Sequence, residues 1–473
     1  MSAIKLPTGR NLEAFLLLIA LVTAFFAYFL VEMQYSDHFK NENWIFMSAI
    51  AFVVYLFHLF LRWKLPYSDP VVLPIAVMLN GLGLVMIQRI DLANAANQYW
   101  IDAAPRQFIW TFIAIAVATF VVFFLKDYRI LRRYTYVMLI ISAILLISPM
   151  IPGLGQQING ARVWIKIGPM SFQPGEIAKI TLAIFFAGYL SSNRDLILLA
   201  GKKVLGMRFP RFKDMAPMLL VWMVSVGMLV LQRDLGTAML YFGLFMSMLY
   251  IATGRTSWIV IGLALISVAV FFVAHIFAHV GDRFQIWMHA FDDDIYNRKF
   301  GGSYQVVQGI FGLSYGGLTG TGLGAGRPFI VPFSNSDFIM TSFGEELGLA
   351  GTLAMLCLFF LFAIRGFRTG ISSRDAFGKL LISGLSFAFA WQCFIIIGGV
   401  TLLIPLTGLT TPFLSAGGSS LVANWIIVAL ILLVSHSSRR PQSEDFNPVM
   451  IPTFVDTPLI PEEGERENEP IYS

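Results

Sequence analysis

Charged residues are scarce in this chain. Only 13% of its 473 residues are Asp, Glu, Lys or Arg, whereas soluble proteins have about 25%. Hydrophobic residues make up 57% of the chain, including 43 phenylalanines that suit a lipid-facing surface. This balance excludes a soluble enzyme and predicts an all-α polytopic membrane protein. The net charge of +5 follows from membrane topology and indicates no nucleic-acid partner.

Cysteine and histidine are also rare. Both cysteines, Cys357 and Cys393, lie inside apolar runs, which predicts packing residues without a disulfide. His275 and His279 have the i,i+4 spacing of a metal pair, with His289 nearby, but no acidic motif accompanies them. The sequence therefore predicts no metal site. It also lacks the GxxxxGKS pattern of P-loop proteins.

Apolar runs long enough to cross roughly 30 Å of hydrocarbon predict about twelve transmembrane helices. They fall at about 12–32, 45–62, 70–88, 107–125, 134–151, 176–192, 217–232, 235–252, 257–279, 337–363, 380–404 and 420–436. Basic residues concentrate in alternate connections, which predicts that both termini are cytoplasmic. No small-residue cleavage site follows the first run, so it is expected to be an uncleaved span.

Three segments of the chain are not predicted spans. Residues 153–175 and 281–336 are polar, glycine-rich loops on the outer face, and the second is a candidate mobile lid. Residues 441–473 are acidic and rich in proline, which predicts a disordered cytoplasmic tail. The predicted organisation is a two-helix extension at 1–69, a membrane core at 70–440 and this tail.

Basic residues on the outer face depart from the positive-inside bias. They are Arg162, Lys166, Arg233, Arg283, Arg298, Lys299 and Arg327, with Lys179 just inside the following helix. Such a set suits a phosphate-bearing ligand that approaches from the outer leaflet. The alternative is that each is an ordinary interfacial residue whose charged end reaches water.

Carboxylates occur at the start of a predicted span in SNSDFIMTSFGEELGLAG, at 334–351. Asp337 could complement the helix dipole, or it could be free for chemistry because neighbouring serines can cap the helix. Helical spacing places positions 337, 341, 345 and 348 on one face. Glu345 would then lie about 12 Å deeper than Asp337, too far to share a proton directly. We expect Glu345 to brace the bundle through a buried partner, and Glu346 to be a structural residue of the same segment.

Two further motifs combine charge with helix-start signals. In ARVWIKIGPMSFQPGEIAK, at 161–179, a proline suited to the first helical position precedes Glu176 and Lys179. These two side chains share a helix face and could form an ion pair. In QRDLGT, Arg233 and Asp234 lie at the tip of a tight turn between two spans.

A fourth motif, PLTGLTTPFLSAGGSSL at 405–421, has glycines and prolines that exclude a regular helix. Non-helical backbone at membrane depth is tolerated only where it is buried in protein or lines a watery cavity. We therefore expect this segment, with Gly417, Gly418 and Ser419, to line a cavity.

Together the four motifs resemble those of the SEDS family (shape, elongation, division and sporulation), the membrane-embedded peptidoglycan polymerases. Close variants of the family patterns RRWI..G...FQPSE..K, QPDLGT, GGL.G.GLG......P....DFIF....EELG and LP.TG...PF.SYGGSS appear here in the same order, within about 70–436. The two additional N-terminal spans, and the stretch LNGLGLVMIQRIDL, resemble the actinobacterial rod-shape branch.

The resemblance implies that lipid II is polymerised into glycan strands at the bacterial plasma membrane for cell elongation, with release of undecaprenyl pyrophosphate. It makes Asp337 the essential acid, expected to act as general base on the extracytoplasmic side. It also implies a class B penicillin-binding protein as partner. A divalent cation could assist the pyrophosphate, although no ligand set demands one. The expected substrate-binding residues are Arg162, Lys166, Glu176, Lys179, Arg233, Asp234, Gln305 and Gln308.

Two other classes of function remain open, as does a role in division instead of elongation. Intramembrane acids beside a broken helix also suit a transporter or flippase for the same lipid. A non-catalytic scaffold for cell-wall synthases is the third class. Departures from the family patterns favour it: Val163, Gly175, Arg233 and Ala416 replace Arg, Ser, Pro and Tyr.

Overall fold

The computed structural model describes residues 9–35, 41–96, 103–158, 161–168, 170–199, 202–204, 207–209, 223, 227, 232, 234–276, 278–298 and 301–441. The first helices are α1 (Arg10–Tyr35), α2 (Asn41–Lys64), α3 (Val72–Ala96), α4 (Ala104–Phe124), α5 (Ile130–Arg133), α6 (Thr135–Ile147) and α7 (Pro174–Leu199). Next come α9 (Leu235–Thr253), α10 (Ser257–Ile276), α11 (Ala278–Met288), α12 (Asp293–Tyr296) and α13 (Tyr304–Gly316). The last are α14 (Ile339–Ile371), α15 (Ala376–Val400) and α16 (Gly418–Arg439).

Eight helices of the described residues are long and apolar enough to cross a membrane: α1, α2, α3, α4, α9, α14, α15 and α16. The chain is therefore an α-helical polytopic membrane protein, as expected. Helices α7 and α10 also occupy predicted spans. The span predicted at 217–232 lies almost entirely outside the described residues, so the count of twelve stays a prediction.

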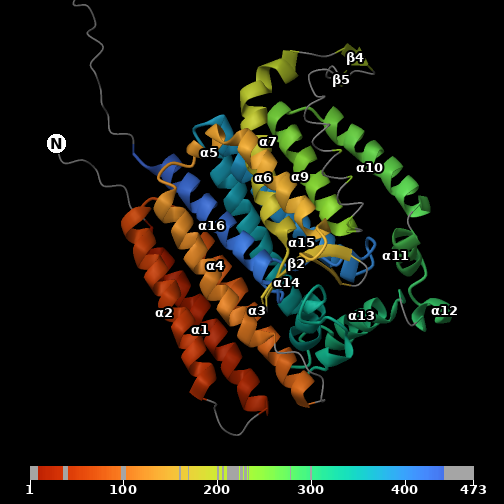
Figure 1. Cartoon of the computed structure of the whole chain (residues 1–473). Helices are drawn as coiled ribbons and strands as arrows, with labels where there is room; N and C mark the ends of the chain where they lie inside the picture. The colour runs from red at the N-terminus through yellow and green to blue at the C-terminus, as the bar shows by residue number, and fades with distance from the viewer. Residues whose placement is uncertain are drawn as a thin grey trace, which may run out of the picture. The chain divides into compact units, whose positions relative to one another are not determined.

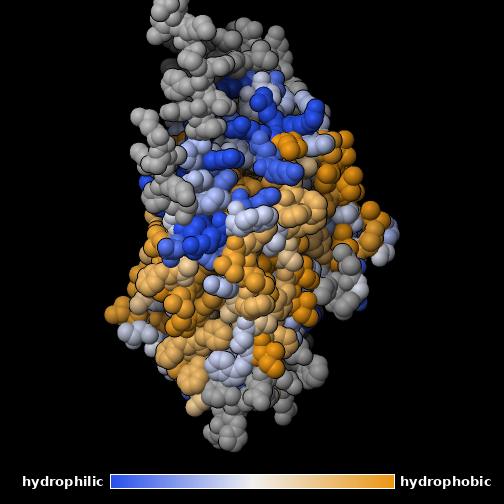
Figure 2. Space-filling model, turned by 90° about the vertical axis from the view of Figure 1, so that its left-hand side faces the viewer, coloured by the Kyte–Doolittle hydropathy of each residue, from blue (hydrophilic) through white to orange (hydrophobic). Residues whose placement is uncertain are grey.

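Helix α16 forms the centre of the bundle. In its most apolar stretch, 94% of the residues are buried, and it contacts α3, α4, α7, α14 and α15. The N-terminal helices lie at one side of the bundle, where α1 packs on α3 and α2 on α4 (Figure 1). Large apolar side chains on α1 and α2 are exposed, and the face in Figure 2 carries a broad apolar area below a hydrophilic cluster. This surface suits contact with lipid.

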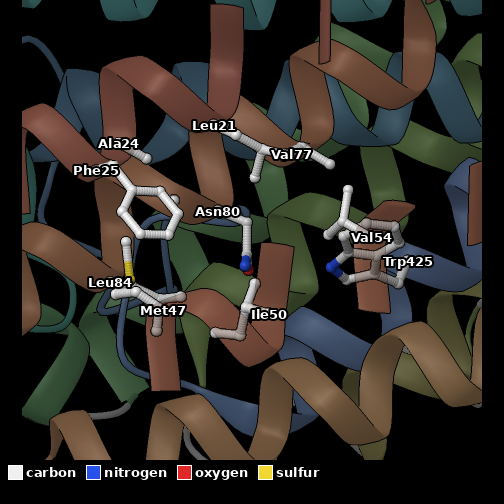
Figure 3. A pocket seen from close by; sticks show the side chains of 11 residues that line it. Leu21, Ala24, Phe25, Met47, Ile50, Val54, Val77, Asn80, Leu84 and Trp425 are labelled. Carbon is white, nitrogen blue, oxygen red and sulfur yellow. The ribbon is translucent and has the colours of Figure 1, made fainter. Parts of the chain in front are cut away.

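A small apolar pocket lies where α1 and α2 meet α3 and α16 (Figure 3). Its lining includes Leu21, Met47 and Leu84. The polar ends of Asn80 and Trp425 point into it. Asn80 Oδ1 and the Trp425 indole N–H have no hydrogen-bond partner among the described residues. The pocket is therefore mostly apolar, with two buried polar groups in its lining.

The two segments predicted as outer loops, 153–175 and 281–336, contain strands and helices, so the prediction of loops there was wrong. The strands β1 (Gly155–Ile158), β2 (Ala161–Ile167) and β3 (Met170–Phe172) form an antiparallel sheet in the order β1-β2-β3. The reason is visible in β2, where Val163 and Ile165 are buried between exposed Arg162 and Lys166, the alternation of a half-buried strand. The second of the two segments, 281–336, holds α12, α13 and most of α11. A separate antiparallel pair, β4 (Lys202–Val204) and β5 (Met207–Phe209), follows α7 and lies outside both segments.

Helix α14 is interrupted at Gly348, which has φ 66° and ψ −167°. The expected face shared by positions 337, 341, 345 and 348 is therefore wrong at both ends. Position 337 precedes the helix in a turn, and Gly348 leaves helical geometry. At the interruption, backbone groups of residues 345–350 bond to those of residues 317–322. Only glycine adopts such a positive φ without steric cost, and a Cβ here would lie 2.3 Å from the Gly320 nitrogen.

Candidate functional site

Asp337 lies in the turn that leads into α14. Its side chain is half-buried, whereas Phe338 beside it is completely buried and anchors the turn. Burial raises the pKa of Asp337 to about 7. Backbone amides and the charge of Arg283 oppose this rise. A carboxyl with this pKa can both accept and release a proton near neutral pH, as a general base must.

The turn is held by the non-helical segment between α15 and α16, residues 401–417, which we call the linker segment. The Ala416 amide donates to the carbonyl of Asn335 at 2.8 Å, and the Ser415 hydroxyl donates to the carbonyl of Ser336. The absence of a helix before Gly418 agrees with the prediction for this motif. The backbone immediately before Asp337 is therefore fixed by a distant part of the chain.

Gln107 of α4 supports the linker segment from the other side. Its amide group donates to the carbonyl of Ser415 at 3.2 Å and accepts from the Gly417 amide at 3.1 Å. A Cβ at Gly418 would lie 2.0 Å from the ring of Trp110, also on α4, so close packing requires glycine there. Ser419 is buried, and its hydroxyl has no partner within the described part of the chain.

Glu176 and Lys179 form the ion pair that their spacing predicts, with Nζ 2.8 Å from Oε2. Lys179 also donates to Gln392 Oε1 at 2.8 Å. Gln392 in turn donates to the carbonyl of Thr410 at 2.9 Å, and the Thr410 hydroxyl donates to Glu176 at 3.3 Å. Because Lys179 is completely buried, its charge serves this network, which joins α7, α15 and the linker segment.

Asp234 caps α9 by accepting hydrogen bonds from the amides of Gly236 and Thr237, at 3.0 and 3.3 Å. Burial raises its pKa, and the charge of Arg283 opposes the rise, as it does at Asp337. A Cβ at Gly236 would lie 3.0 Å from Thr407. The QRDLGT motif therefore also meets the linker segment.

Arg283 and Trp287 of α11 also bind the linker segment. Arg283 donates to the carbonyls of Leu406 and Thr407 at 2.9 and 3.0 Å, and the Trp287 indole donates to the carbonyl of Leu402 at 2.8 Å. All four sequence motifs therefore converge on residues 401–417. Arg283 is the cation whose charge acts on both Asp234 and Asp337.

The other predicted substrate-binding residues lie in different settings. Arg162 and Lys166 are exposed on β2. Gln305 of α13 donates to the carbonyl of Pro332 at 3.0 Å, and Gln308 donates to the Tyr296 hydroxyl at 2.8 Å. Arg233 lies outside the described residues, as do the side chains of His275 and His279. Among the described residues, no group of three or more His, Cys, Asp or Glu side chains is placed to hold a metal ion.

Glu345 and Glu346 both accept hydrogen bonds from the loop that precedes Asp337. Glu345 accepts a hydrogen bond from the Arg327 amide at 2.7 Å. Glu346 accepts one from the Gly324 amide at 2.8 Å and forms an ion pair with Arg89, Nε to Oε1, also at 2.8 Å. Both glutamates thereby hold the loop that precedes Asp337.

Three polar residues at these contacts were missed from the sequence: Arg89, Gln107 and Gln392. Each is buried on an apolar helix. Arg89 gave the clearest signal, because an arginine at the end of a predicted span must find a partner. The two glutamines gave weaker signals, since amides are less costly to bury than charges.

Comparison with known proteins agrees with this arrangement. Residues 70–440 match the model of the FtsW/RodA/SpoVE family, described as cell cycle proteins. The chain is 45% identical over 442 residues to the peptidoglycan glycosyltransferase RodA of Mycobacterium tuberculosis, with 92% of each chain covered. It is 44% identical over 441 residues to that of Mycobacterium leprae, with the same coverage.

Solved structures show the same fold. The rod shape determining protein RodA of Thermus thermophilus aligns with a TM-score of 0.55 and 23% identity, over 79% of this chain and 98% of that one. A chain of a peptidoglycan synthase complex aligns with a TM-score of 0.55 and 24% identity, over 84% of this chain and 98% of that one. The family model covers the whole helical core and all four motifs, and the chain therefore belongs to the FtsW/RodA/SpoVE family.

Proposed function

We propose that this protein is a peptidoglycan glycosyltransferase that polymerises lipid II into glycan strands. The observation that carries the proposal is the setting of Asp337. Its carboxyl group is half-buried with a pKa of about 7, and it lies where the four family motifs meet. The mycobacterial relatives, which carry this activity in their names, are similar over 92% of the chain.

In the proposed reaction, Asp337 removes the proton from the 4-hydroxyl of the acceptor sugar. That oxygen forms a bond to the anomeric carbon of the donor, with inversion. The bond from that carbon to the pyrophosphate oxygen breaks, and undecaprenyl pyrophosphate leaves with the electron pair. The proton remains on Asp337 until it is lost to water. A base of this pKa matches a reaction run near neutral pH.

The leaving pyrophosphate gains negative charge and requires cations. Arg283 is the first candidate, because its charge reaches both Asp337 and Asp234. Exposed Arg162 and Lys166 on β2, together with Arg233, are candidates for the first encounter with the lipid head group. Lys179, completely buried against Glu176, is assigned to supporting the site.

Similarity to the rod-shape proteins supports a role in cell elongation. We also propose that the chain crosses the plasma membrane twelve times and that its site lies on the extracytoplasmic side. The fold is shared with a chain of a peptidoglycan synthase complex that couples polymerization and crosslinking. We therefore propose a single-span transpeptidase, a class B penicillin-binding protein, as its partner.

The test is polymerisation of labelled lipid II by the purified protein with this transpeptidase, for the wild type and for Asp337→Asn. We expect glycan strands from the wild type and none from the variant. Strands from both would show that Asp337 is not the base. Strands from neither would overturn the proposal, and transbilayer movement of labelled lipid II would then separate a flippase from a non-catalytic scaffold.

A further inference from the structure

Arg89 is a completely buried arginine in the second half of α3, the first helix of the family core. Its Nε lies 2.8 Å from Glu346 Oε1 of α14. Its Nη2 donates to the carbonyl of Gly326 at 2.7 Å. One guanidinium group therefore joins two transmembrane helices and the loop between α13 and α14.

This loop, residues 317–327, forms hydrogen bonds to α14 from several of its residues. The amides of Thr321 and Gly322 donate to the carbonyls of Glu345 and Glu346, both at 3.0 Å. The Gly324 and Arg327 amides donate to the carboxylates of the same two glutamates. The space at Gly326 is filled, since a Cβ there would lie 2.7 Å from Glu346 Cγ. Arg89 adds the attachment of this assembly to α3.

The N-terminal extension reaches the same place. The ring centroid of Tyr35, at the end of α1, lies 5.0 Å from the guanidinium carbon of Arg89. A Cβ at Gly324 would lie 3.2 Å from the side chain of Gln34. The end of α1 therefore covers both Arg89 and the loop that Arg89 holds. An aromatic ring so placed favours the charged guanidinium.

The attached loop leads directly to Asp337. After Arg327 comes the short helix Pro328–Ile330, which contacts α3, and then buried Val331. The backbone at Asp337 is thus held upstream by the loop and downstream by α14, and both are tied to Arg89 and Glu346. A shift of the loop relative to α3 would move the carboxyl of Asp337.

We propose that Arg89, with Glu346 and under the cover of Tyr35, is a positioning residue that sets the place of Asp337 by fixing residues 317–327 between α3 and α14. The proposal rests on the proposed glycosyltransferase function and gives the N-terminal extension a part in it. Arginine is required because its planar group reaches a carboxylate and a carbonyl at once. A lysine ammonium is a point charge on a flexible stem and does not reproduce that fork.

The test compares Arg89→Lys with Arg10→Lys in the full chain with its transpeptidase. Arg10 is a matched control, because it is also buried, forms an ion pair with Glu13 at 2.7 Å and donates to a backbone carbonyl, that of Pro66. It contacts Pro66 and Ser68, in the connection between α2 and α3, rather than the loop. Two quantities are measured: kcat and KM for lipid II, and hydrogen exchange of the amides in 317–338.

For Arg89→Lys we expect kcat to fall at least about 10-fold, with KM within about twofold of wild type, because a misplaced base affects the transition state more than binding. We also expect faster exchange confined to residues 317–338. Arg10→Lys should change neither kcat nor that exchange, whatever its effect on thermal stability. Tyr35→Ala should give a smaller change of the same kind.

Unchanged exchange in 317–338 would overturn the proposal, because Arg89 would not be fixing the loop. Faster exchange with normal kcat would also overturn it, because the loop would not be setting Asp337. A wild type without polymerase activity would defeat the proposed function instead. In that case localised exchange in Arg89→Lys, absent in Arg10→Lys, would still support the loop attachment.

Discussion

The carbonyl oxygen of Ser336 accepts a hydrogen bond from the hydroxyl of Ser415, 79 residues further along the chain. The same hydroxyl accepts from the Thr411 amide at 2.8 Å. A single small side chain thus connects the turn before Asp337 to the interior of the linker segment. The position of the proposed base depends on this connection, and several predictions derive from such contacts.

Replacing Ser415 by alanine should lower kcat for polymerisation about 10-fold, because the turn before Asp337 loses a fixed partner. It also leaves the Thr411 amide without its acceptor, which should cost about 1–3 kcal/mol of stability. Steady-state kinetics and thermal unfolding in detergent measure the two effects. Ser386→Ala is the control, since Ser386 is buried and, among the described residues, its hydroxyl bonds only to the carbonyl of Ile382 in its own helix. Equal loss of activity in both variants would contradict this role for Ser415.

Asp337→Asn and Asp337→Ala should lower the rate of polymerisation at least about 100-fold, because the general base is lost. Expression of both variants should stay normal. The measurement is glycan strand formation from labelled lipid II. The control is Asp375→Asn, because Asp375 is also an acid just before a helix, where it accepts from the Gly378 amide at 2.7 Å, but that helix is α15. Strands formed by Asp337→Asn at the wild-type rate would show that another group takes the proton.

Polymerisation by the wild type should rise with pH with a midpoint near 7, because burial raises the pKa of Asp337 to about 7 and the base must be ionised. The rate profile is measured from pH 5.5 to 8.5 at saturating lipid II, as an approximate window around that pKa. A flat profile below pH 7 would contradict an Asp337 base with a raised pKa.

The same shift predicts a pH-dependent stability difference. The folded pKa of Asp337 lies above the ordinary value of 3.8, so its contribution to stability is present below pH 3.8 and is lost as the pH rises through 7. Asp337→Asn should therefore be more stable than the wild type at pH 8, by roughly 1–3 kcal/mol after allowance for partial exposure, and nearly equal to it at pH 4. Thermal unfolding at both pH values is the check, and no gain at pH 8 would contradict it.

Lys179→Met should destabilise the protein by about 3–5 kcal/mol, because it leaves the carboxylate of Glu176 buried without its cation. The double variant Lys179→Met with Glu176→Gln should recover part of that loss. Arg129→Met is the matched control: its ion pair with Asp375, at 3.4 Å, is exposed and should contribute less than about 1 kcal/mol. Equal melting temperatures for Lys179→Met and Arg129→Met would contradict the assigned role of the buried pair.

Much of the fold and the site could be predicted because hydropathy and motif order are local properties. Apolar runs located the eight candidate spans, and the glycines and prolines of 405–421 located the non-helical linker segment. The spacing of Glu176 and Lys179 indicated that they could form an ion pair, since both lie on one helical turn, and the structure contains that pair.

The remainder depends on contacts between distant residues or on competing local signals. The Gly326 carbonyl, 237 residues from Arg89, could not be assigned to it without an alignment or a structure. The break at Gly348 was missed because a single glycine is compatible with a helix. The β1-β2-β3 sheet was missed because β1 and β3 have only four and three residues and turn residues lie around the strands.

The contacts of α11 bear on how substrate could enter. Arg283 and Trp287 supply the donors for the carbonyls of Leu402, Leu406 and Thr407. A swing of α11 away from the linker segment would leave these three carbonyls without donors, and lipid tails cannot replace them. Water would have to enter as α11 leaves. The movement of α11 and the entry of water would then occur together. Lowering the water activity should therefore slow the opening of this side of the site.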